Sequence, residues 1–306
     1  MSLRTDSDGS TGRRLVGVAV IVLALGAVLL TVLAFTHVRS QPSDEKVAPV
    51  PTFTQPSRVS PSPTPTAPPS ASAPVYDRSQ ERFLAAGSGV LWRGVAGSCG
   101  AEPAMLERST DDGGTWTDVT PNYLGIEQLE RVSAFAGDQA QIVASMGEEC
   151  QVQALRTFTQ GRFWESYDDV LAASQYIDPT QPGSVVRPGG ALDAPCADGR
   201  AVQVSGSLVA LSCAGTAYVL EADDSWVSLP ASGVAALTTV ENDLLVAHVA
   251  EGCSGLALTR YVGAESGTAE DAGCIEGVDA AAPTAIASVD DHVLVWSGET
   301  WEAITQ

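Results

Sequence analysis

The feature that most constrains this chain is a β-hairpin pattern repeated through its last three quarters. Each copy is an apolar run, a short turn of Gly, Asp or Asn, and a second apolar run, which is typical of two antiparallel strands. The copies start at Arg82, Arg131, Arg200, Val234 and Thr284. Their starts differ by 49, 69, 34 and 50 residues. The mean of these spacings matches a propeller blade of about 40 to 50 residues.

Two more strand-like pieces follow most of these hairpins, and the second piece usually opens on tryptophan, as in VQALRTF followed by TQGRFW. Four strands per repeat and five repeats predict an all-β fold, a β-propeller of about five four-stranded blades over residues 75–306. Only ETWEAIT completes the last copy, so we expect Val75 to Gln80 to supply its missing strand. A β-sandwich is the alternative, because it too has short strands at regular turn spacing.

Residues 15–36 read LVGVAVIVLALGAVLLTVLAFT, without a charge. This run is long enough to cross about 30 Å of hydrocarbon as a helix. A cleaved signal peptide is the alternative, although its apolar region would be roughly 7 to 15 residues and would end at a small-residue site. Arg13 and Arg14 precede the run, which predicts a cytoplasmic tail over 1–14 and everything after the span outside the cell.

Residues 37–74 are rich in Pro, Ser and Thr; positions 41–74 hold 10 of the chain's 18 prolines. Such a segment buries too little apolar surface to fold and favours an extended, polyproline-like form. We therefore expect an extracellular stalk that carries the 75–306 domain away from a cell membrane. A single span, this stalk and an Ala-, Val- and Gly-rich composition are typical of a bacterial surface protein.

The outer domain is strongly acidic, with 10 arginines, no lysine and 33 of the 37 acidic residues. Its net charge of 10 minus 33, or −23, opposes binding to phosphate backbones, so no nucleic-acid partner is expected. A P-loop and a Schiff-base site both need a lysine, and Lys46 lies in the linker. Neither a cofactor nor a metal site is expected, because no clustered His or CxxC pair is present.

All six cysteines lie in the outer domain, and an even number outside the membrane predicts disulfides. Six cysteines allow 15 pairings. Their places in the hairpin pattern put all six on one face of the ring and favour Cys99 with Cys150, Cys196 with Cys213, and Cys253 with Cys274.

The stretch STDDGGTW contains Ser109, Asp111, Gly113, Thr115 and Trp116. It resembles the Asp-box, or BNR repeat, of sialidase and sortilin-like propellers, with eroded copies at Gly161 with Trp164, at Asp224 with Trp226, and at Trp301. Asp and Ser side chains accept hydrogen bonds from their own turn, and glycine tolerates a positive φ. We predict that Asp111 braces a turn and is not an acid catalyst. The resemblance implies that a ligand site lies on the face opposite this turn.

The long connection from Glu165 to Gly199 falls on that predicted ligand face and collects carboxylates and aromatic residues. The candidate binding residues are Glu148, Glu149, Tyr167, Asp168, Asp169, Tyr176, Asp178 and Arg187. An acidic, partly aromatic rim suits a basic protein segment, a metal ion or a sugar. A plain solvated acidic surface is the alternative, since the whole domain is acidic.

We therefore expect a membrane-anchored, extracytoplasmic propeller that binds a protein or cell-wall polymer, without a catalytic residue. The resemblance implies one alternative, a sialidase-like glycoside hydrolase that holds its substrate carboxylate with three arginines. The family's Arg-Ile-Pro motif is replaced by FLAAG near the first blade, and no arginine triad can be assigned. A second alternative is an assembly or stability factor for a membrane protein.

Overall fold

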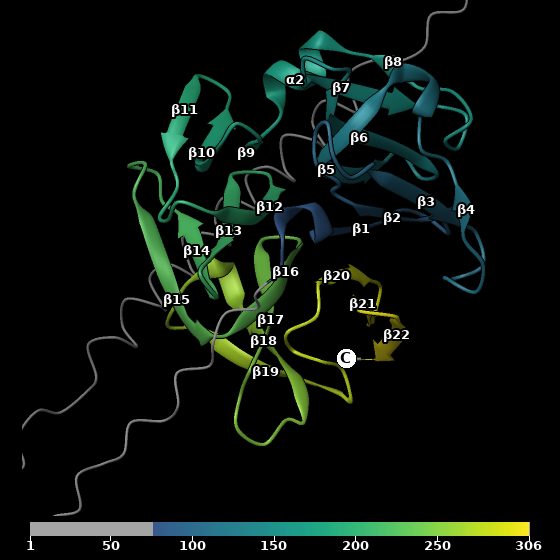
Figure 1. Cartoon of the computed structure of the whole chain (residues 1–306). Helices are drawn as coiled ribbons and strands as arrows, with labels where there is room; N and C mark the ends of the chain where they lie inside the picture. Colours follow the sequence, from purple (N-terminus) through teal and green to yellow (C-terminus); the bar gives the residue numbers. More distant parts are fainter. Residues whose placement is uncertain (1–75, 306) are drawn as a thin grey trace, which may run out of the picture. The chain divides into compact units, whose positions relative to one another are not determined.

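The structure is a computed structural model that describes residues 76–305. Six antiparallel sheets, here called blades 1 to 6, follow one another in chain order around a central axis (Figure 1). The all-β propeller prediction is confirmed, but the ring has six blades and not five. Among residues 76–305, no helix has both the length and the apolar character needed to cross a membrane. The predicted span and stalk lie outside the described residues.

The strands of the first three blades have the following bounds. Blade 1 contains β1 (Arg82–Ala86), β2 (Leu91–Val95), β3 (Met105–Ser109) and β4 (Thr117–Asp118). Blade 2 contains β5 (Ile126–Phe135), β6 (Gln139–Met146), β7 (Gln151–Thr157) and β8 (Glu165–Ser166). Blade 3 contains β9 (Tyr176–Asp178), β10 (Gln181–Arg187) and β11 (Gly190–Asp193).

The last three blades continue the ring. Blade 4 contains β12 (Gly199–Ser205), β13 (Leu208–Cys213), β14 (Thr216–Leu220) and β15 (Trp226–Ser232). Blade 5 contains β16 (Val234–Val240), β17 (Asp243–His248), β18 (Gly255–Tyr261) and β19 (Ala269–Glu276). Blade 6 contains β20 (Thr284–Val289), β21 (His292–Ser297) and β22 (Thr300–Thr305). The helical elements are η1 (Arg78–Gln80), η2 (Asn122–Leu124), α2 (Asp168–Ala173) and η3 (Val262–Ala264).

Blade 3 is the blade that the sequence pattern misses. The connection expected between Glu165 and Gly199 folds instead into helix α2 and the three short strands of this blade. The strands have three, seven and four residues, and prolines and glycines interrupt them. No long apolar run therefore marks them in the sequence, since strand recognition depends on alternation over several residues.

Contacts with blade 4 give the strand directions of blade 3. A Cβ at Gly183, near the start of β10, would lie against Cys196 and Ala197, just before β12. At the other end of β10, Arg187 pairs with Asp224 in the turn between β14 and β15. These two places lie at opposite ends of blade 4. Strand β10 therefore runs in the same direction as β14, so β9, β10 and β11 match the second, third and fourth strands of blade 4. Helix α2 precedes them where the other blades have their first strand.

The core lies between neighbouring blades. Blades 1 and 2 enclose Trp92, Leu106, Leu129, Ile142 and Leu155, each no more than 1% exposed. Similar layers of Val, Leu and Ala separate blades 4, 5 and 6. Because each sheet has both faces covered, the second strands of the blades read as nearly continuous apolar runs.

The ring closes between blades 6 and 1 through side chains. Blade 6 has three strands, and Arg78–Gln80 form the 3-10 turn η1, so the predicted donation of a strand by Val75 to Gln80 is wrong for these three residues. The Trp301 ring lies on the turn after β3, and its Nε1 donates to the Asp112 carbonyl at 3.3 Å. Trp301 also meets Trp116 edge to face, with the ring centroids 5.1 Å apart.

Two arginines of blade 1 extend this junction. The Arg82 guanidinium lies 4.1 Å from the centre of the Trp296 ring. Arg93 lies 4.7 Å from the same ring and 4.1 Å from the Trp116 ring, and its Nη2 is 2.6 Å from a Glu107 carboxylate oxygen. Cation–π contacts of this kind contribute about 0.5 to 2 kcal/mol each, depending on how far they are removed from water.

The Ser109–Trp116 turn is braced by its own side chains, as predicted. Asp111 accepts hydrogen bonds from the Thr115 amide at 2.9 Å and the Thr115 hydroxyl at 2.7 Å, and the Gly113 amide donates to Ser109 Oγ at 2.9 Å. The two hydrogen bonds from Thr115 lower the pKa of Asp111 below its usual value. A hydrogen bond between the Ser109 side chain and the Asp111 carboxylate adds to this shift. A carboxyl group held ionised in this way serves the turn and is a poor general acid.

The turn between β7 and β8 repeats this geometry with different residues. The Gly161 amide donates to Thr157 Oγ1 at 2.8 Å, and the Phe163 amide donates to Thr159 Oγ1 at 2.9 Å. Thr157 and Thr159 thus replace the Ser and Asp of the first turn. Trp164 completes the match by packing edge to face against Trp92, with the ring centroids 6.1 Å apart.

Three disulfides join Cys99 to Cys150, Cys196 to Cys213, and Cys253 to Cys274, which confirms the predicted pairing. Five of the six cysteines lie just before an inner strand or at the turn between the second and third strands of a blade, and Cys274 lies near the end of β19, on the same side. We call this side the disulfide face. The two Trp-bearing turns after β3 and β7 lie on the other side, the opposite face, because consecutive strands reverse direction.

Replacing Gly113 with Ala tests the junction between blades 6 and 1. A Cβ there would overlap the Trp301 ring, and φ is +87°. Gly137→Ala is the matched control, because φ is +84° and nothing lies within 4 Å of its Cβ. We expect G113A to lower the free energy of unfolding by about 2 to 4 kcal/mol, against about 1 kcal/mol for G137A, in urea titrations. Equal losses in the two variants would contradict the contact with Trp301.

Candidate functional site

The predicted binding residues do not come together as one site. Glu148 and Glu149 lie exposed on the disulfide face, in the turn between β6 and β7 next to Cys150. Asp168 and Asp169 are exposed in the first turn of α2. Asp178 lies at the end of β9, where it accepts hydrogen bonds from the Thr180 amide and hydroxyl. These residues therefore occupy separate elements of blades 2 and 3.

Two of the remaining three residues lie elsewhere than expected. Tyr176 is 7% exposed and packs between blades 2 and 3, so it belongs to the core. Arg187 lies on the opposite face, where it makes a bidentate pair with Asp224 at 2.7 and 2.6 Å. Its predicted place on the disulfide face is wrong because the expected loop folds into blade 3, whose turn between β10 and β11 lies on the opposite face. Tyr167 follows β8 at the outer edge of blade 2.

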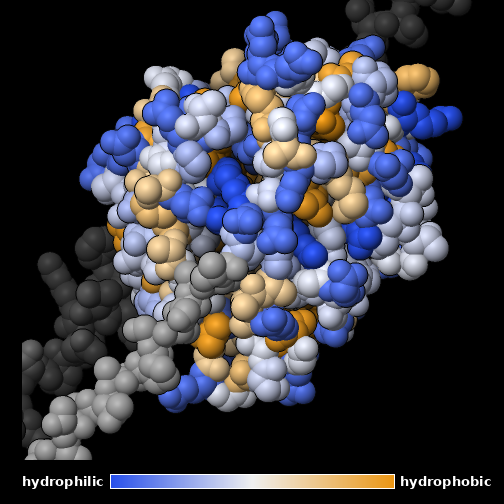
Figure 2. Space-filling view, in the orientation of Figure 1, coloured by the Kyte–Doolittle hydropathy of each residue, from blue (hydrophilic) through white to orange (hydrophobic). Residues whose placement is uncertain are grey.

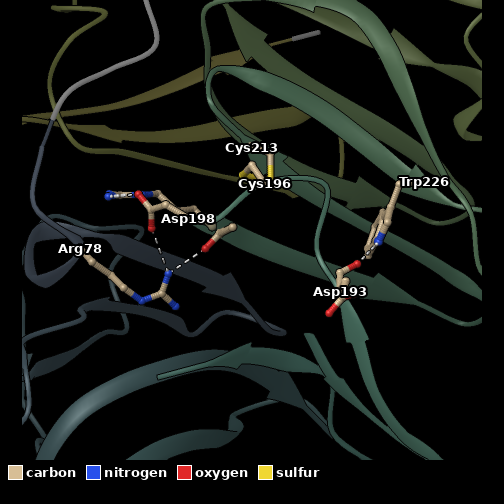
Figure 3. The surroundings of a disulfide bond; sticks show 8 residues. Arg78, Asp193, Cys196, Asp198, Cys213 and Trp226 are labelled. Atoms are coloured by element: carbon tan, nitrogen blue, oxygen red, sulfur yellow. Dashed lines mark hydrogen bonds and ion pairs between the residues drawn. A yellow bond between two sulfur atoms is a disulfide. The ribbon is translucent and has the colours of Figure 1, made fainter. Parts of the chain in front are cut away.

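The disulfide face instead gathers a charged group that the sequence did not predict, here called the mouth cluster. It consists of Arg78, Glu81, Glu130, Asp198 and Arg200. Figure 2 shows strongly hydrophilic residues near the middle of the visible face. In Figure 3, Arg78 points toward Asp198 beside the Cys196–Cys213 disulfide.

Arg78 holds the mouth cluster together. Its Nη1 donates to the Gly199 carbonyl at 2.7 Å, and its two terminal nitrogens lie 3.5 Å from Glu130 and 3.6 Å from Glu81. One carboxylate oxygen of Glu81 and one of Glu130 accept no hydrogen bond within the described residues. At these distances, Arg78 only partly offsets the cost of burying the two carboxylates.

Burial dominates the electrostatics of this cluster. The Glu130 side chain is 0% exposed, and its burial raises its pKa to about 7 even though Arg78 opposes the shift. Burial also raises the pKa of Tyr76 to about 12, beside the Arg200 guanidinium, which lies 4.9 Å from its ring centre. Glu130 is thus a carboxyl group that changes charge near neutral pH.

The central channel has a volume of about 200 Å³. Its walls are the inner strands β1, β5, β12, β16 and β20, and β9 supplies none of the lining residues. Most of the lining side chains are Ala, Val, Thr and Ser, with Arg82 and Arg131 as the charged members. The channel is therefore narrow, and its charge is positive.

A second feature is an aromatic patch on blade 2, formed by Phe135, Arg156, Phe158, Phe163 and Tyr167. Phe158 meets Phe135 and Tyr167 edge to face, with ring centroids 5.7 and 6.2 Å apart. Arg156 lies 4.9 Å from the Phe135 ring centre and 5.7 Å from that of Tyr167. Phe158 is 54% exposed and Phe163 is 68% exposed. The aromatic rings are ordered against one another but remain open to solvent.

The sequence contained a signal for this patch. Phe158 and Phe163 flank the TQGR turn, where a turn without a binding role usually exposes polar residues. In the sequence they belong to the same turn as Trp164, so they look like further anchors of that turn. The structure shows that Trp164 is buried and that the two phenylalanines point outward.

Comparisons with known proteins find similarity in the fold alone. No protein-family model and no curated protein matches this chain. A solved structure titled YCF48 bound to D1 peptide is 14% identical, over 70% of this chain and 73% of that one, with a TM-score of 0.38. The Hadza microbial sialidase Hz136 is 14% identical, over 73% of this chain, with a TM-score of 0.36.

A Bacteroides ovatus xyloglucan-locus protein, GH43B, is 8% identical over 75% of this chain, with a TM-score of 0.39. The chain spans about half the length of the sialidase and of GH43B, 52% and 49%. These neighbours thus include both binding proteins and glycoside hydrolases.

Glu130→Gln tests the electrostatics of the mouth cluster. Because the folded-state pKa is about 7 and the usual value is 4.5, the folded protein retains a proton that the unfolded chain releases. The stabilising effect of protonation is complete below about pH 4.5 and is lost as the pH rises through 7. Relative to E130Q, the wild type should lose roughly 3 kcal/mol of unfolding free energy between pH 4.5 and pH 8.

Urea titrations at the two pH values measure this difference. Glu149→Gln removes one exposed carboxylate from the same blade and serves as the control. An E130Q protein whose stability depends on pH in the same way as that of the wild type would show that Glu130 is ionised and well solvated.

Proposed function

We propose that this protein is an exported β-propeller that binds a protein or a cell-wall polymer through blade 2. The predicted span over 15–36 would hold it at the cell membrane, with the predicted stalk over 37–74 between the membrane and the propeller. Three disulfides within the propeller suit an oxidising compartment outside the cytoplasm.

The observation that carries this proposal is the exposure of the aromatic patch. Leaving a Phe side chain in water forgoes about 1.5 to 3 kcal/mol that its burial would contribute. Phe158 and Phe163 nevertheless stay largely exposed, and the Phe158 ring meets that of Tyr167. Aromatic residues and arginine dominate the energetically important positions of binding surfaces. Tyr123, 62% exposed, extends the surface, since its hydroxyl accepts a hydrogen bond from the Trp164 amide at 2.7 Å.

Both ligand classes suit a patch of this composition. Aromatic side chains with arginine and a polar rim bind protein surfaces. The rim is acidic here, with Asp138 in the turn between β5 and β6, Glu165 at the start of β8 and Asp169 in α2. Carboxylates can accept hydrogen bonds from sugar hydroxyls. The framework of blade 2 fixes this surface, because its turn is braced by Thr157 and Thr159.

A double variant, F158A/F163A, tests the proposal. The probes are purified peptidoglycan in a sedimentation assay and an array of immobilised peptides. We expect the propeller to bind one of these probes. The double variant should bind it at least ten times more weakly, because the interface loses two aromatic rings that the ligand would cover. The control V227A/V262A removes apolar groups of 39% and 40% exposure from blades 4 and 5.

Equal loss in the two double variants would show general surface adhesion instead of a site on blade 2. Binding that survives F158A/F163A unchanged, or no binding to either class of probe, would also count against the proposal. Thermal unfolding of each variant confirms that the fold is intact, which we expect because both phenylalanines lie on the surface.

The hydrolase alternative requires several free arginines in one place. At the mouth, Arg78 and Arg200 pair with the chain's own carboxylates, and Arg82 lies against Trp296. We therefore expect no turnover of a fluorogenic sialoside. Hydrolysis at a rate well above that of buffer, lost on replacing Arg131 in the channel, would establish the alternative.

A further inference from the structure

The central channel differs in charge from the rest of the outer domain. Residues 75–306 contain 33 acidic residues and 10 arginines, yet no acidic side chain lines the channel and two arginines do. The inner strands are also sheet edges, so some of their backbone N–H groups face the channel without a strand partner. The channel is thus a small positive space inside an acidic domain.

Arg131 is the residue that calls for explanation. Arg131 lines the channel from β5, and its side chain makes one hydrogen bond within the described residues, from Nη1 to the Gln175 carbonyl at 3.3 Å. None of the ion pairs within residues 76–305 includes it. Its burial lowers its pKa below the usual value, which reflects the cost of keeping this charge away from water.

Other partly buried arginines of the ring have a defined partner. Arg93, Arg200 and Arg260 each lie 2.6 Å from a carboxylate oxygen. Arg82, the other arginine of the channel, stacks on Trp296 and donates to the Gly298 carbonyl. A buried cation without a countercharge is costly, so natural proteins normally pair it or place it at a ligand.

Ser133 provides a second unsatisfied group in the same place. It lies two residues after Arg131 on β5, so the two side chains project from the same face of the strand. Both residues line the channel. The Ser133 hydroxyl is buried and has no hydrogen-bond partner among the described residues. A charged donor and a neutral donor are therefore both available within one stretch of the channel wall.

We propose that the central channel binds one compact anion, a halide or a small carboxylate, between the Arg131 guanidinium and the Ser133 hydroxyl. The anion supplies the countercharge that the protein lacks, and the Ser133 hydroxyl donates to it. A guanidinium presents parallel N–H groups that match a carboxylate. The volume of about 200 Å³ suits an ion of acetate size and excludes a bulky ligand.

An entry path leads from the opposite face. A hollow of about 570 Å³ lies there between the first turns of blades 1, 2 and 6, and it shares Ala86, Ala134 and Ser288 with the channel. Most of its wall is made of small residues, including Gly87, Gly89 and Gly137, and Phe135, Val289 and Asp290 complete it. A small ion can therefore reach Arg131 without passing the mouth cluster on the disulfide face.

Thermal unfolding of the propeller in zwitterionic buffer with rising sodium acetate or sodium bromide tests the proposal. A bound anion raises the melting temperature along a saturating curve, because it stabilises only the folded state. We expect this curve for the wild type and its loss in Arg131→Met. Arg162→Met, which removes an exposed arginine from the turn between β7 and β8, is the matched control and should behave as the wild type.

Two further measurements keep the test decisive if Arg131→Met does not fold. Ser133→Ala should weaken the fitted acetate affinity about three- to tenfold, since it removes one hydrogen bond to a charged group. Crystals soaked in bromide should show an anomalous peak beside the Arg131 guanidinium. A wild-type curve that does not saturate, equal curves for Arg131→Met and the wild type, or a channel without bromide would overturn the proposal. None of these outcomes bears on ligand binding by blade 2.

Discussion

The contact between the first and last blades is the interaction on which this ring depends. Every other neighbouring pair of blades is linked by a short chain connection, but blades 1 and 6 meet through residues as far apart as Asp112 and Trp301. No shared strand joins them in the described chain, because blade 6 ends with β22. The Trp116, Trp296 and Trp301 rings, with Arg82 and Arg93 stacked on two of them, replace that strand. Hydrophobic burial and cation–π contact must together offset the entropy of bringing the two ends together.

The two faces of this closed ring are stabilised in different ways. On the opposite face, side-chain hydrogen bonds fix the tight turns after β3 and β7, and the tryptophan that follows each turn packs at a blade junction. On the disulfide face, three covalent bridges restrict the turns and connections. The aromatic patch lies at one of the rigid turns, so its rings are held in place at little cost in conformational entropy. Preorganisation of this kind favours binding.

How much the sequence predicts follows from the range of the interactions involved. The sequence predicts the hairpins from the alternation of apolar residues and the Ser109–Trp116 turn from local hydrogen bonds. It predicts the disulfide pairing from the positions of the cysteines along the strands. Blade 3 was missed because its strands are short and contain Pro182 and Gly183 within β10. Without that blade in the prediction, the turn that carries Arg187 was placed in a loop on the wrong face. The burial of Glu130 and the isolation of Arg131 likewise arise only when β5 is placed inside the ring.

Native-state hydrogen exchange of the propeller tests the account most directly, because it reports the free energy of opening for each strand. If side chains alone close the ring, the amides of β1 and β2 and those of β20 and β21 should share one opening free energy. Trp301→Ala should then lower it equally in both blades. Early and independent exchange of blade 6, with blade 1 unaffected by the substitution, would contradict closure through this junction.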